Sequence, residues 1–422
     1  MSTSIETPRA SISIVIVGHV DHGKSTLVGR LFYDTDSLPE GRYEAVARVC
    51  EQTGKPFEFA FLLDALEEER DQGITIDTAR AQFHTALRDY VLIDAPGHKE
   101  FLKNMVSGAA AAEAALLLID AEEGVQEQSR RHGYLLHLLG IRQVVVVINK
   151  MDLVGFEQWV YEDVRREYLD FLAALGVHPQ AVVPVSAREG DNIARNSEHM
   201  PWYDGPTVVE ALDAFAARTS REHLPLRLPV QDVYKFDHRR IIAGRVEAGA
   251  IAEGDTVLFS PSGHRGVVKS IERWHSPRTG PAQAGESIGI TLTEQLFIER
   301  GEIVSHVADA PRAGTELRAN LFWLGDRHLA PGRPYVLKLA TQEIPCAVAG
   351  VSGVINTATL GNVEAHEVAK NEVATVTLSL KAPVAYDCFT DIVETGRFVL
   401  VDGYDVAGGG IVLPPVENDF TI

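Results

Sequence analysis

The first half of the chain alternates apolar runs with segments of helical spacing. The apolar runs have the length of strands and lie at residues 11–17, 90–95, 114–121, 143–150 and 181–187. Each precedes a segment with the apolar spacing of a helix, such as residues 25–35. Apolar strands separated by helices are typical of a parallel sheet covered on both faces. The pattern therefore predicts an α/β domain with a mostly parallel sheet over residues 1–222.

The pattern changes after about residue 222. Short runs of alternating polar and apolar residues follow, separated by Gly, Pro and Asp. They include residues 229–236, 241–249, 255–260, 266–274, 316–324, 335–340, 372–380 and 396–401. Such runs are typical of antiparallel barrels or sandwiches. A second change of pattern near ADAPRAGTE predicts two domains here, residues 223–310 and 311–422.

A glycine-rich loop follows the first predicted strand. Residues 18–26 read GHVDHGKST and match G-x-x-x-x-G-K-[ST], the pattern of a phosphate-binding loop between a strand and a helix. In such a loop the backbone N–H groups and the helix N-terminus point at one anion. We expect Lys24 to reach the β- and γ-phosphates and the Ser25 hydroxyl to ligate Mg²⁺. The residues expected around the phosphates are Gly18, His19, Val20, Asp21, His22, Gly23, Lys24, Ser25 and Thr26.

The two histidines of this loop, His19 and His22, raise the question of a metal site. They are expected to shape the loop or its water shell rather than to bind metal.

The segment NKMD, residues 149–152, indicates which base is bound. The Asp152 carboxylate can accept two hydrogen bonds from the N1–H and N2 amino edge of guanine, whereas adenine has an acceptor at N1. Asn149 is expected to contact the base or to tie the loops together, and the stem of Lys150 to cover the ring. In SAREG, the Ala187 N–H would reach the guanine O6. The expected base-binding residues are Asn149, Lys150, Asp152, Ser186, Ala187 and Arg188. A helix N-cap is the alternative for NKMD alone.

The segment DAPGH ends another predicted strand and contains groups suited to the γ-phosphate. Asp94 fits the carboxylate that holds Mg²⁺ through water, and the Gly97 N–H can contact the γ-phosphate. His98 stands where a residue is needed to orient the attacking water, so it is the expected catalytic residue. A structural surface histidine is the alternative.

The segment DQGITID contains Thr75, which is expected to ligate Mg²⁺ through its hydroxyl and to sense the γ-phosphate through its N–H. Loss of the γ-phosphate would release Thr75 and Gly97 together. Residues 60–77 and 94–108 are therefore the expected switch segments. The expected catalytic group is thus Lys24, Thr75, Gly97 and His98.

Composition and charge narrow the class of protein. Lys and Arg number 39 against 59 Asp and Glu, and the formal net charge of −20 argues against broad nucleic-acid binding. Three cysteines without a C-x-x-C pair favour buried free thiols in a reducing compartment. The longest apolar region is interrupted by Glu113 and Asp120, short of a membrane span. A soluble, cytoplasmic protein is expected.

Together, these motifs resemble those of the translation-factor class of GTPases. The resemblance covers the whole chain and implies a GTP-binding domain followed by two antiparallel β-barrels. It also implies that Val20 and Ile74 form an apolar gate in front of the catalytic histidine.

Within that class the chain looks most like the large, GTP-binding subunit of bacterial sulfate adenylyltransferase. The segments that carry this resemblance are FLLDALEEERDQGITID, SAREGDNIARNSEHMPWYDGPTVVEALD and TGRFVLVDGYDVAGGGIV. The resemblance implies that GTP hydrolysis drives a separate, small catalytic subunit of the ATP-pyrophosphatase type, which makes adenylyl sulfate from ATP and sulfate. No second phosphate loop occurs, so no fused adenylyl-sulfate kinase is expected.

Other members of the class remain open. DAPGHKEFLKNMVSG and MPWYDGPT are similar in elongation factor 1-alpha, which carries aminoacyl-tRNA, and YKFDHRRIIAGRVEAG reads closer to that factor's barrel. A paralogue that drives a different adenylyltransferase and a stand-alone regulatory GTPase are the further alternatives.

Overall fold

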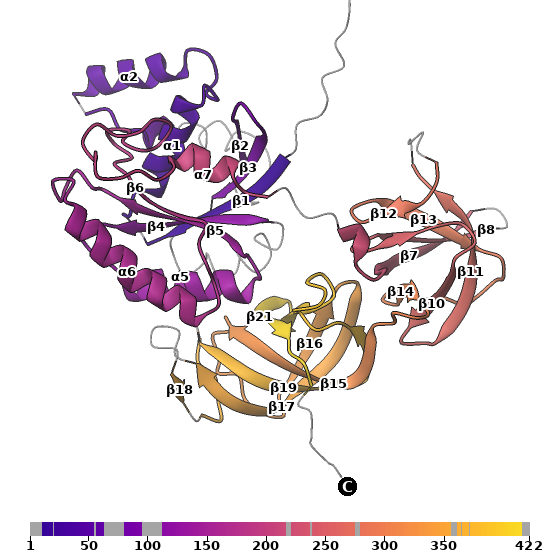
Figure 1. Ribbon diagram of the computed structural model, residues 1–422. Helices are drawn as coiled ribbons and strands as arrows, with labels where there is room; N and C mark the ends of the chain where they lie inside the picture. The colour runs from indigo at the N-terminus through magenta and orange to yellow at the C-terminus, as the bar shows by residue number, and fades with distance from the viewer. Residues whose placement is uncertain are drawn as a thin grey trace, which may run out of the picture. The chain divides into compact units, whose positions relative to one another are not determined.

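The chain folds into two compact units, Met1–Arg218 and Thr219–Ile422 (Figure 1). The computed structural model describes residues 11–19, 21–54, 56–62, 80–94, 112–216, 221–236, 239–274, 279–355, 361–363, 365–370 and 372–415. The three-domain division with boundaries at 222/223 and 310/311 stays a prediction.

The first unit is built on a six-stranded sheet with the order β2-β3-β1-β4-β5-β6. Its strands are β1 (Ser11–Gly18), β2 (Arg80–His84), β3 (Asp89–Asp94), β4 (Ala114–Asp120), β5 (Gln143–Asn149) and β6 (Ala181–Pro184). The strands β3, β1, β4, β5 and β6 pair in parallel. Strand β2, which the sequence pattern did not reveal, pairs antiparallel with β3 at one edge. The prediction of a mostly parallel sheet is confirmed.

Helices cover both faces of this sheet (Figure 1). They are α1 (Lys24–Asp34), α5 (Glu127–Leu138), α6 (Gln158–Ala174) and α7 (Val208–Asp213), whereas α2 (Arg42–Thr53) stands apart from the sheet and packs in a separate small cluster with Leu62. Because side chains alternate along a strand, Ile12, Ile14 and Ile16 of β1 share one face, where they pack with α1 and α7. Helices α5 and α6 lie together on the other face. Burial on both faces explains why the central strands are apolar throughout.

The parallel arrangement brings the carboxyl ends of the strands to one edge of the sheet. Ile16 pairs with Asp94, and Gly18 pairs with Leu118 of β4. Asp120, at the end of β4, pairs with Asn149, at the end of β5. The segments that follow these strands are therefore neighbours in space, although they are distant in sequence.

Strand β6 lies at the other edge of the sheet, and two tyrosines cover its backbone. The Val182 carbonyl accepts hydrogen bonds from the hydroxyl groups of Tyr161 at 2.9 Å and Tyr203 at 3.3 Å. Tyr161 lies in α6, and burial raises its pKa to about 12. Both hydroxyls thus act as donors at neutral pH.

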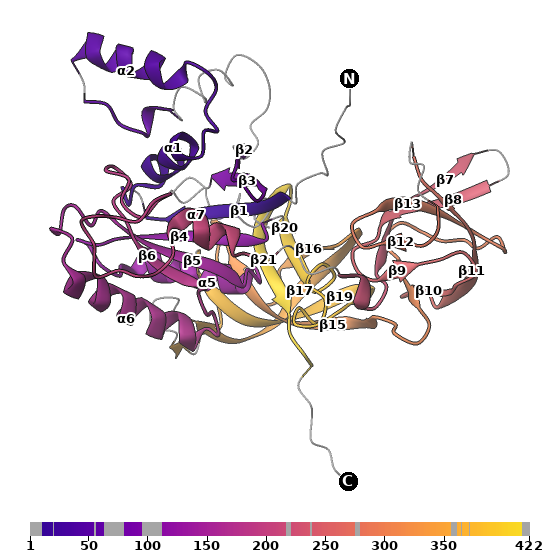
Figure 2. The same cartoon turned by 45° about the horizontal axis from the view of Figure 1, so that its top comes forward.

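The second unit begins with a closed barrel of the strand order β10-β11-β13-β8-β7-β14 (Figure 2). Its strands are β7 (Leu228–Phe236), β8 (Arg239–Arg245), β10 (Thr256–Ser260), β11 (His264–Glu272), β13 (Ser287–Leu292) and β14 (Ile303–His306). The 3-10 helix η2 (Arg221–His223) precedes them, and β9 (Ala250–Ile251) and β12 (Ala282–Gln283) form a separate two-stranded sheet. The inward side chains Val257 and Phe259 are buried in the barrel core, whereas Thr256 is exposed and Leu258 is half-buried. This alternation is the signal that the sequence pattern carried.

A second antiparallel sheet follows in the order β16-β20-β21-β15-β19-β17-β18, and pairing of β16 with β17 closes it. Its strands are β15 (Arg312–Trp323), β16 (Pro334–Leu339), β17 (Gln342–Ile355), β18 (Asn362–Val363), β19 (Val373–Tyr386), β20 (Arg397–Asp402) and β21 (Asp405–Val412). Trp323 is among the largest fully buried side chains of the described residues. The prediction of an α/β domain followed by two antiparallel β-barrels is confirmed.

A buried ion pair between Arg227 and Asp387 lies within this second unit. Arg227 precedes β7 of one barrel, and Asp387 follows β19 of the other.

Among the described residues, no helix is long and apolar enough to cross a bilayer.

Candidate functional site

The phosphate loop predicted from the sequence connects β1 to α1. Gly23 caps the N-terminus of α1 with φ of 88°, in the left-handed region that favours glycine. A Cβ atom at Gly23 would lie 2.4 Å from the Asn149 Nδ2 atom. Both the backbone conformation and the close approach therefore require glycine here. Asp21 also has a positive φ, of 65°.

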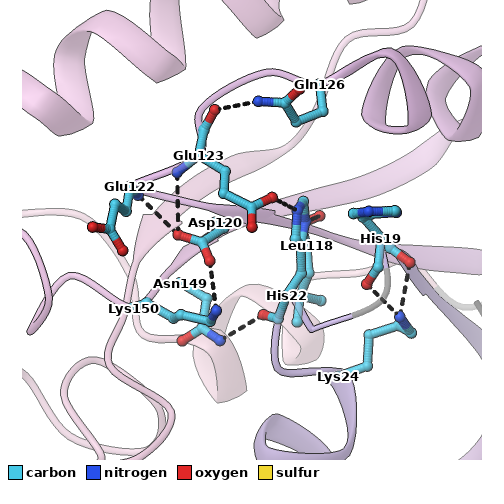
Figure 3. A network of polar contacts seen from close by, with 11 residues as sticks. His19, His22, Lys24, Leu118, Asp120, Glu122, Glu123, Gln126, Asn149 and Lys150 are labelled. Atoms are coloured by element: carbon cyan, nitrogen blue, oxygen red, sulfur yellow. Dashed lines mark hydrogen bonds and ion pairs between the residues drawn. The ribbon is translucent and has the colours of Figure 1, made fainter.

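Lys24 holds its ammonium group against this loop. Its Nζ donates hydrogen bonds to the carbonyl oxygens of Gly18 at 2.8 Å and His19 at 2.7 Å (Figure 3). The first turn of α1 contains no acidic residue, so the lysine charge and the helix dipole act together at the loop. Ser25 and Thr26 lie in this same turn, with Ser25 exposed. The arrangement suits an anion.

Asn149 joins the phosphate loop to the loop after β6. Its Nδ2 donates to the His22 carbonyl at 2.9 Å, and its Oδ1 accepts from the Ala187 N–H at 3.0 Å. The side chain is buried, so these bonds are shielded from water. They correspond to the loop-tying role, one of the two roles considered for Asn149. A guanine O6 at Ala187 would share the N–H with Asn149.

Lys150 is positioned by an aspartate that sequence reasoning missed. Its Nζ lies 2.6 Å from the Asp120 Oδ2 atom, and the Asp120 side chain is only 1% exposed. Asp120 Oδ1 also accepts from the Glu122 N–H at 2.8 Å (Figure 3). Lys150 itself has a φ of 64°. The signal in the sequence was a carboxylate at the end of an apolar strand, Asp120 in LLLIDA.

His22 links the phosphate loop to the end of β4. Its Nδ1 donates to the Leu118 carbonyl at 3.2 Å, and its Nε2 lies 3.2 Å from Glu123 Oε2 (Figure 3). Burial lowers the pKa of His22, opposed by its contacts with Leu118 and Glu123. Both ring nitrogens are thus engaged, which is consistent with the expected loop-shaping role.

The remaining base-site residues lie on two adjacent loops. Asp152 is half-buried just after Lys150. A backbone hydrogen bond from Met151 N to Val185 O, 3.1 Å long, holds the two loops together. Ser186 is buried and its Oγ accepts from the Glu189 N–H, whereas Arg188 is exposed. The structure thus brings NKMD and SAREG side by side.

The predicted metal ligands are only partly described. Asp94 ends β3, beside Ile16 of β1, and so lies near the beginning of the phosphate loop. Ser25 lies in the first turn of α1. Hydroxyl and carboxylate oxygens are the donors that Mg²⁺ prefers, so the residues fit this ion. The predicted site residues outside the described part of the chain are Val20, Ile74, Thr75, Gly97 and His98.

Two protein families match the chain in the regions where these features lie. The elongation factor Tu GTP binding domain matches residues 9–218, and the GTP-eEF1A C-terminal domain-like family matches residues 316–413. Sulfate adenylyltransferase subunit 1 of Laribacter hongkongensis is 39% identical over 95% of this chain and 85% of its own. Elongation factor 1-alpha of Pyrococcus horikoshii is 38% identical over 95% of this chain and 97% of its own. The chain belongs to the translation-factor class of GTPases.

This GTPase binds guanine nucleotide and hydrolyses GTP, as expected of the class. It is also 38% identical to the bifunctional enzyme NodQ of Rhizobium sp. (strain N33), over 96% of this chain and 64% of that protein. Of its expected binding residues, those described by the structure gather at the carboxyl edge of the sheet, around Asn149. Asp120 and Glu123 belong to the same polar network.

Proposed function

We propose that this GTPase couples GTP hydrolysis to ATP-dependent sulfate activation by a separate catalytic subunit. The observation that carries the proposal is the similarity, along almost the whole chain, to sulfate adenylyltransferase subunit 1 of several bacteria. The net charge of −20 also suits a protein partner better than tRNA. The partner we propose is a small adenylyltransferase of the ATP-pyrophosphatase type, working with this chain as a heterodimer in the cytoplasm.

The chemistry explains why two proteins would work together. A phosphosulfate anhydride made from ATP lies steeply uphill, so its formation needs a second source of free energy. Hydrolysis of GTP in one subunit can supply it if the hydrolysis changes the contacts that this subunit makes with its partner. The expected switch segments, residues 60–77 and 94–108, are the proposed carriers of that change.

The nucleotide would bind with its phosphates in the phosphate loop and its base between NKMD and SAREG. The Lys24 ammonium, now bound to the carbonyls of Gly18 and His19, lies where it can turn to the β- and γ-phosphates. Asp152 would read the N1–H and N2 edge of guanine. Asn149 would keep the two halves of the site in register.

Hydrolysis would require a water molecule in line with the γ-phosphate. We assign its orientation to His98, with Val20 and Ile74 as an apolar gate, and the γ-phosphate contacts to Thr75 and Gly97. The oxygen donors Ser25, Thr75 and Asp94 would hold Mg²⁺, which neutralises charge on the β- and γ-phosphates.

Reconstitution with a purified catalytic subunit of the ATP-pyrophosphatase type tests the function. We expect GTP hydrolysis to rise when ATP and sulfate are both present, and adenylyl sulfate to form in proportion to the GTP consumed. His98→Ala should retain GTP binding and lose most of both activities, by about 100-fold or more. Sulfate-independent GTP hydrolysis with no adenylyl sulfate formed would refute the coupling.

An aminoacyl-tRNA carrier is the second candidate function. It is favoured by the similarity to elongation factor 1-alpha of Pyrococcus horikoshii, 97% of which is covered by the match. A carrier should protect aminoacyl-tRNA from deacylation when GTP is bound, and the protection should weaken steeply as salt rises. Protection of this kind, without sulfate-stimulated hydrolysis, would replace the first proposal by the second.

A further inference from the structure

The guanidinium group of Arg30 is held by an ion pair inside α1. Its Nε lies 2.9 Å from both carboxylate oxygens of Asp34, one helical turn away. The two side chains are only 18% and 13% exposed. This is a bifurcated ion pair, in which the two carboxylate oxygens share one N–H, and it leaves the Nη groups and the flat faces of the guanidinium for other segments.

One of those segments is the loop after β6. Arg30 Nη1 donates to the Arg188 carbonyl at 3.4 Å. Gly190 packs against the same group, since a Cβ atom at Gly190 would lie 2.0 Å from Arg30 Nη2. Gly190 has φ of 92°, so its conformation favours glycine as well. The loop backbone thus lies directly on the guanidinium.

The other segment lies between α2 and the start of the undescribed residues 63–79. The Arg30 guanidinium carbon is 4.9 Å from the centroid of the Phe59 ring. The backbone approaches α1 here too, because a Cβ atom at Gly29 would lie 2.1 Å from the Phe59 carbonyl oxygen. The Phe59 ring also contacts Tyr33, at 5.5 Å between centroids, and Phe57, at 5.2 Å. Phe59 therefore anchors residues 56–62 to α1, and Arg30 is one of the α1 residues that it contacts.

We propose that Arg30 is a positioning residue that holds residues 186–190 against the 6-position of guanine and couples this loop to residues 56–62. The inference rests on the proposed base site. Arginine suits the role because one planar group can pair with Asp34, donate to Arg188 and stack on Phe59 at once. The ammonium group of a lysine carries the same charge on one compact group, so it cannot make the contacts with Asp34, Arg188 and Phe59 at the same time. Arg30 acts through the loop and does not itself contact the nucleotide.

Arg30→Lys, measured with three nucleotides, tests the positioning role. The dissociation constants of GDP, 6-thio-GDP and IDP are compared by titration calorimetry on the full chain. In 6-thio-GDP a sulfur, which is a weaker hydrogen-bond acceptor, replaces O6, whereas IDP lacks the amino group assigned to Asp152. The matched control is Arg130→Lys, because Arg130 pairs with Glu167 at 2.7 Å and stacks on Phe171 at 5.1 Å, on α5 and α6.

We expect Arg30→Lys to lower the preference for GDP over 6-thio-GDP by about three- to tenfold, the scale of one hydrogen bond. Its preference for GDP over IDP should stay within about twofold, and Arg130→Lys should change neither ratio. An equal loss for all three nucleotides, or no loss, overturns the positioning role, as does a wild-type chain that does not distinguish GDP from 6-thio-GDP. A wild-type chain that does not distinguish GDP from IDP instead refutes the Asp152 assignment in the proposed site.

Phe59→Leu tests the coupling to residues 56–62. This substitution keeps an apolar side chain but removes the aromatic face beneath the guanidinium. We expect it to lower the preference for GDP over 6-thio-GDP in the same direction as Arg30→Lys. The double variant should be no worse than Arg30→Lys alone, because the two residues act as one unit. Additive effects, or an unchanged ratio in Phe59→Leu, overturn the coupling.

Discussion

Arg227 and Asp387 form a bidentate, buried ion pair. The Arg227 Nε atom lies 2.7 Å from Asp387 Oδ2, and Nη2 lies 2.8 Å from Oδ1. Arg227 Nη1 donates to the carbonyls of Leu226 and Asp309, and the Thr395 hydroxyl donates to Asp387 at 2.5 Å. The arginine and the carboxylate each have further hydrogen-bond partners in addition to each other, which is the condition under which a buried pair is tolerated. The pair joins the start of one barrel to the end of a strand of the other.

Asp387→Asn should destabilise the second unit strongly. The substitution removes one charge and leaves the Arg227 guanidinium buried without its counter-ion, which costs about 3–5 kcal/mol. Chemical denaturation measures the loss as a lower midpoint. The control is Asp402→Asn, which breaks the half-exposed pair with Arg333 at 2.8 Å and should cost less than about 1 kcal/mol. An equal loss of stability in the two variants would show that the buried ion pair contributes no more to stability than the half-exposed one.

Asn149→Ala should weaken nucleotide binding and stability together. It leaves the His22 carbonyl and the Ala187 N–H without their partner, and each unsatisfied buried group costs about 1–3 kcal/mol. We expect GDP affinity to fall by about tenfold or more, measured by calorimetry. Asn320→Ala, which removes a 2.8 Å bond to Thr375 within a barrel, serves as the control and should leave GDP affinity intact. Unchanged GDP binding in Asn149→Ala would contradict the loop-tying role.

Asp152→Asn should move base preference from guanine toward xanthine. Xanthine carries an oxygen where guanine has its amino group, so an amide at position 152 can donate to it. The ratio of the affinities for XTP and GTP should rise by about tenfold or more, because mismatched buried polar groups are strongly disfavoured. Asp163→Asn, on the exposed side of α6, is the control. If the preference stays with GTP, Asp152 does not read the base.

Acid should destabilise the first unit through His132. Burial lowers the pKa of this histidine to about 3, and the positive charge of Lys24 lowers it further. A histidine in an unfolded chain has a pKa of about 6.5. Between these values the unfolded chain binds a proton that the folded chain does not, so stability falls as pH falls. The slope contributed is at most about 1.4 kcal/mol per pH unit.

Denaturation at pH values from 7 to 5 measures this slope. His132→Gln should flatten the dependence, because the titrating group is gone. His328→Gln is the control, since His328 is exposed and lies beside Glu367 on a barrel. A His132 variant that keeps the full wild-type slope would place the acid sensitivity elsewhere.

The sequence predicted most of the elements because their patterns are local. The apolar run before Gly18 and the alternation around Val257 can each be read within a few residues. Strand β17 was missed because Pro345, Gly350 and Gly353 interrupt its alternation, and its pairing with β19 shifts register beside both glycines.

The motifs predicted which segments form the candidate site, but they did not predict the side-chain contacts that hold these segments together. The pairing of Lys150 with Asp120 and the stacking of Arg30 against residues 56–62 join segments distant in sequence. No local pattern encodes such contacts, because they depend on which strands become neighbours in the sheet. The roles of Thr75, Gly97 and His98 stay predictions.

The hydroxyl groups of Tyr161 and Tyr203 occupy a backbone acceptor on the outermost strand of the first unit. The unpaired backbone carbonyl and N–H groups of an edge strand can pair with an extended segment of another molecule, and such pairing leads to aggregation. Because the two hydroxyl groups occupy the Val182 carbonyl, this carbonyl is not available to accept a hydrogen bond from the backbone of an added strand. At this one position the side chains of the folded chain itself, rather than a neighbouring molecule, satisfy the outward-facing backbone of β6.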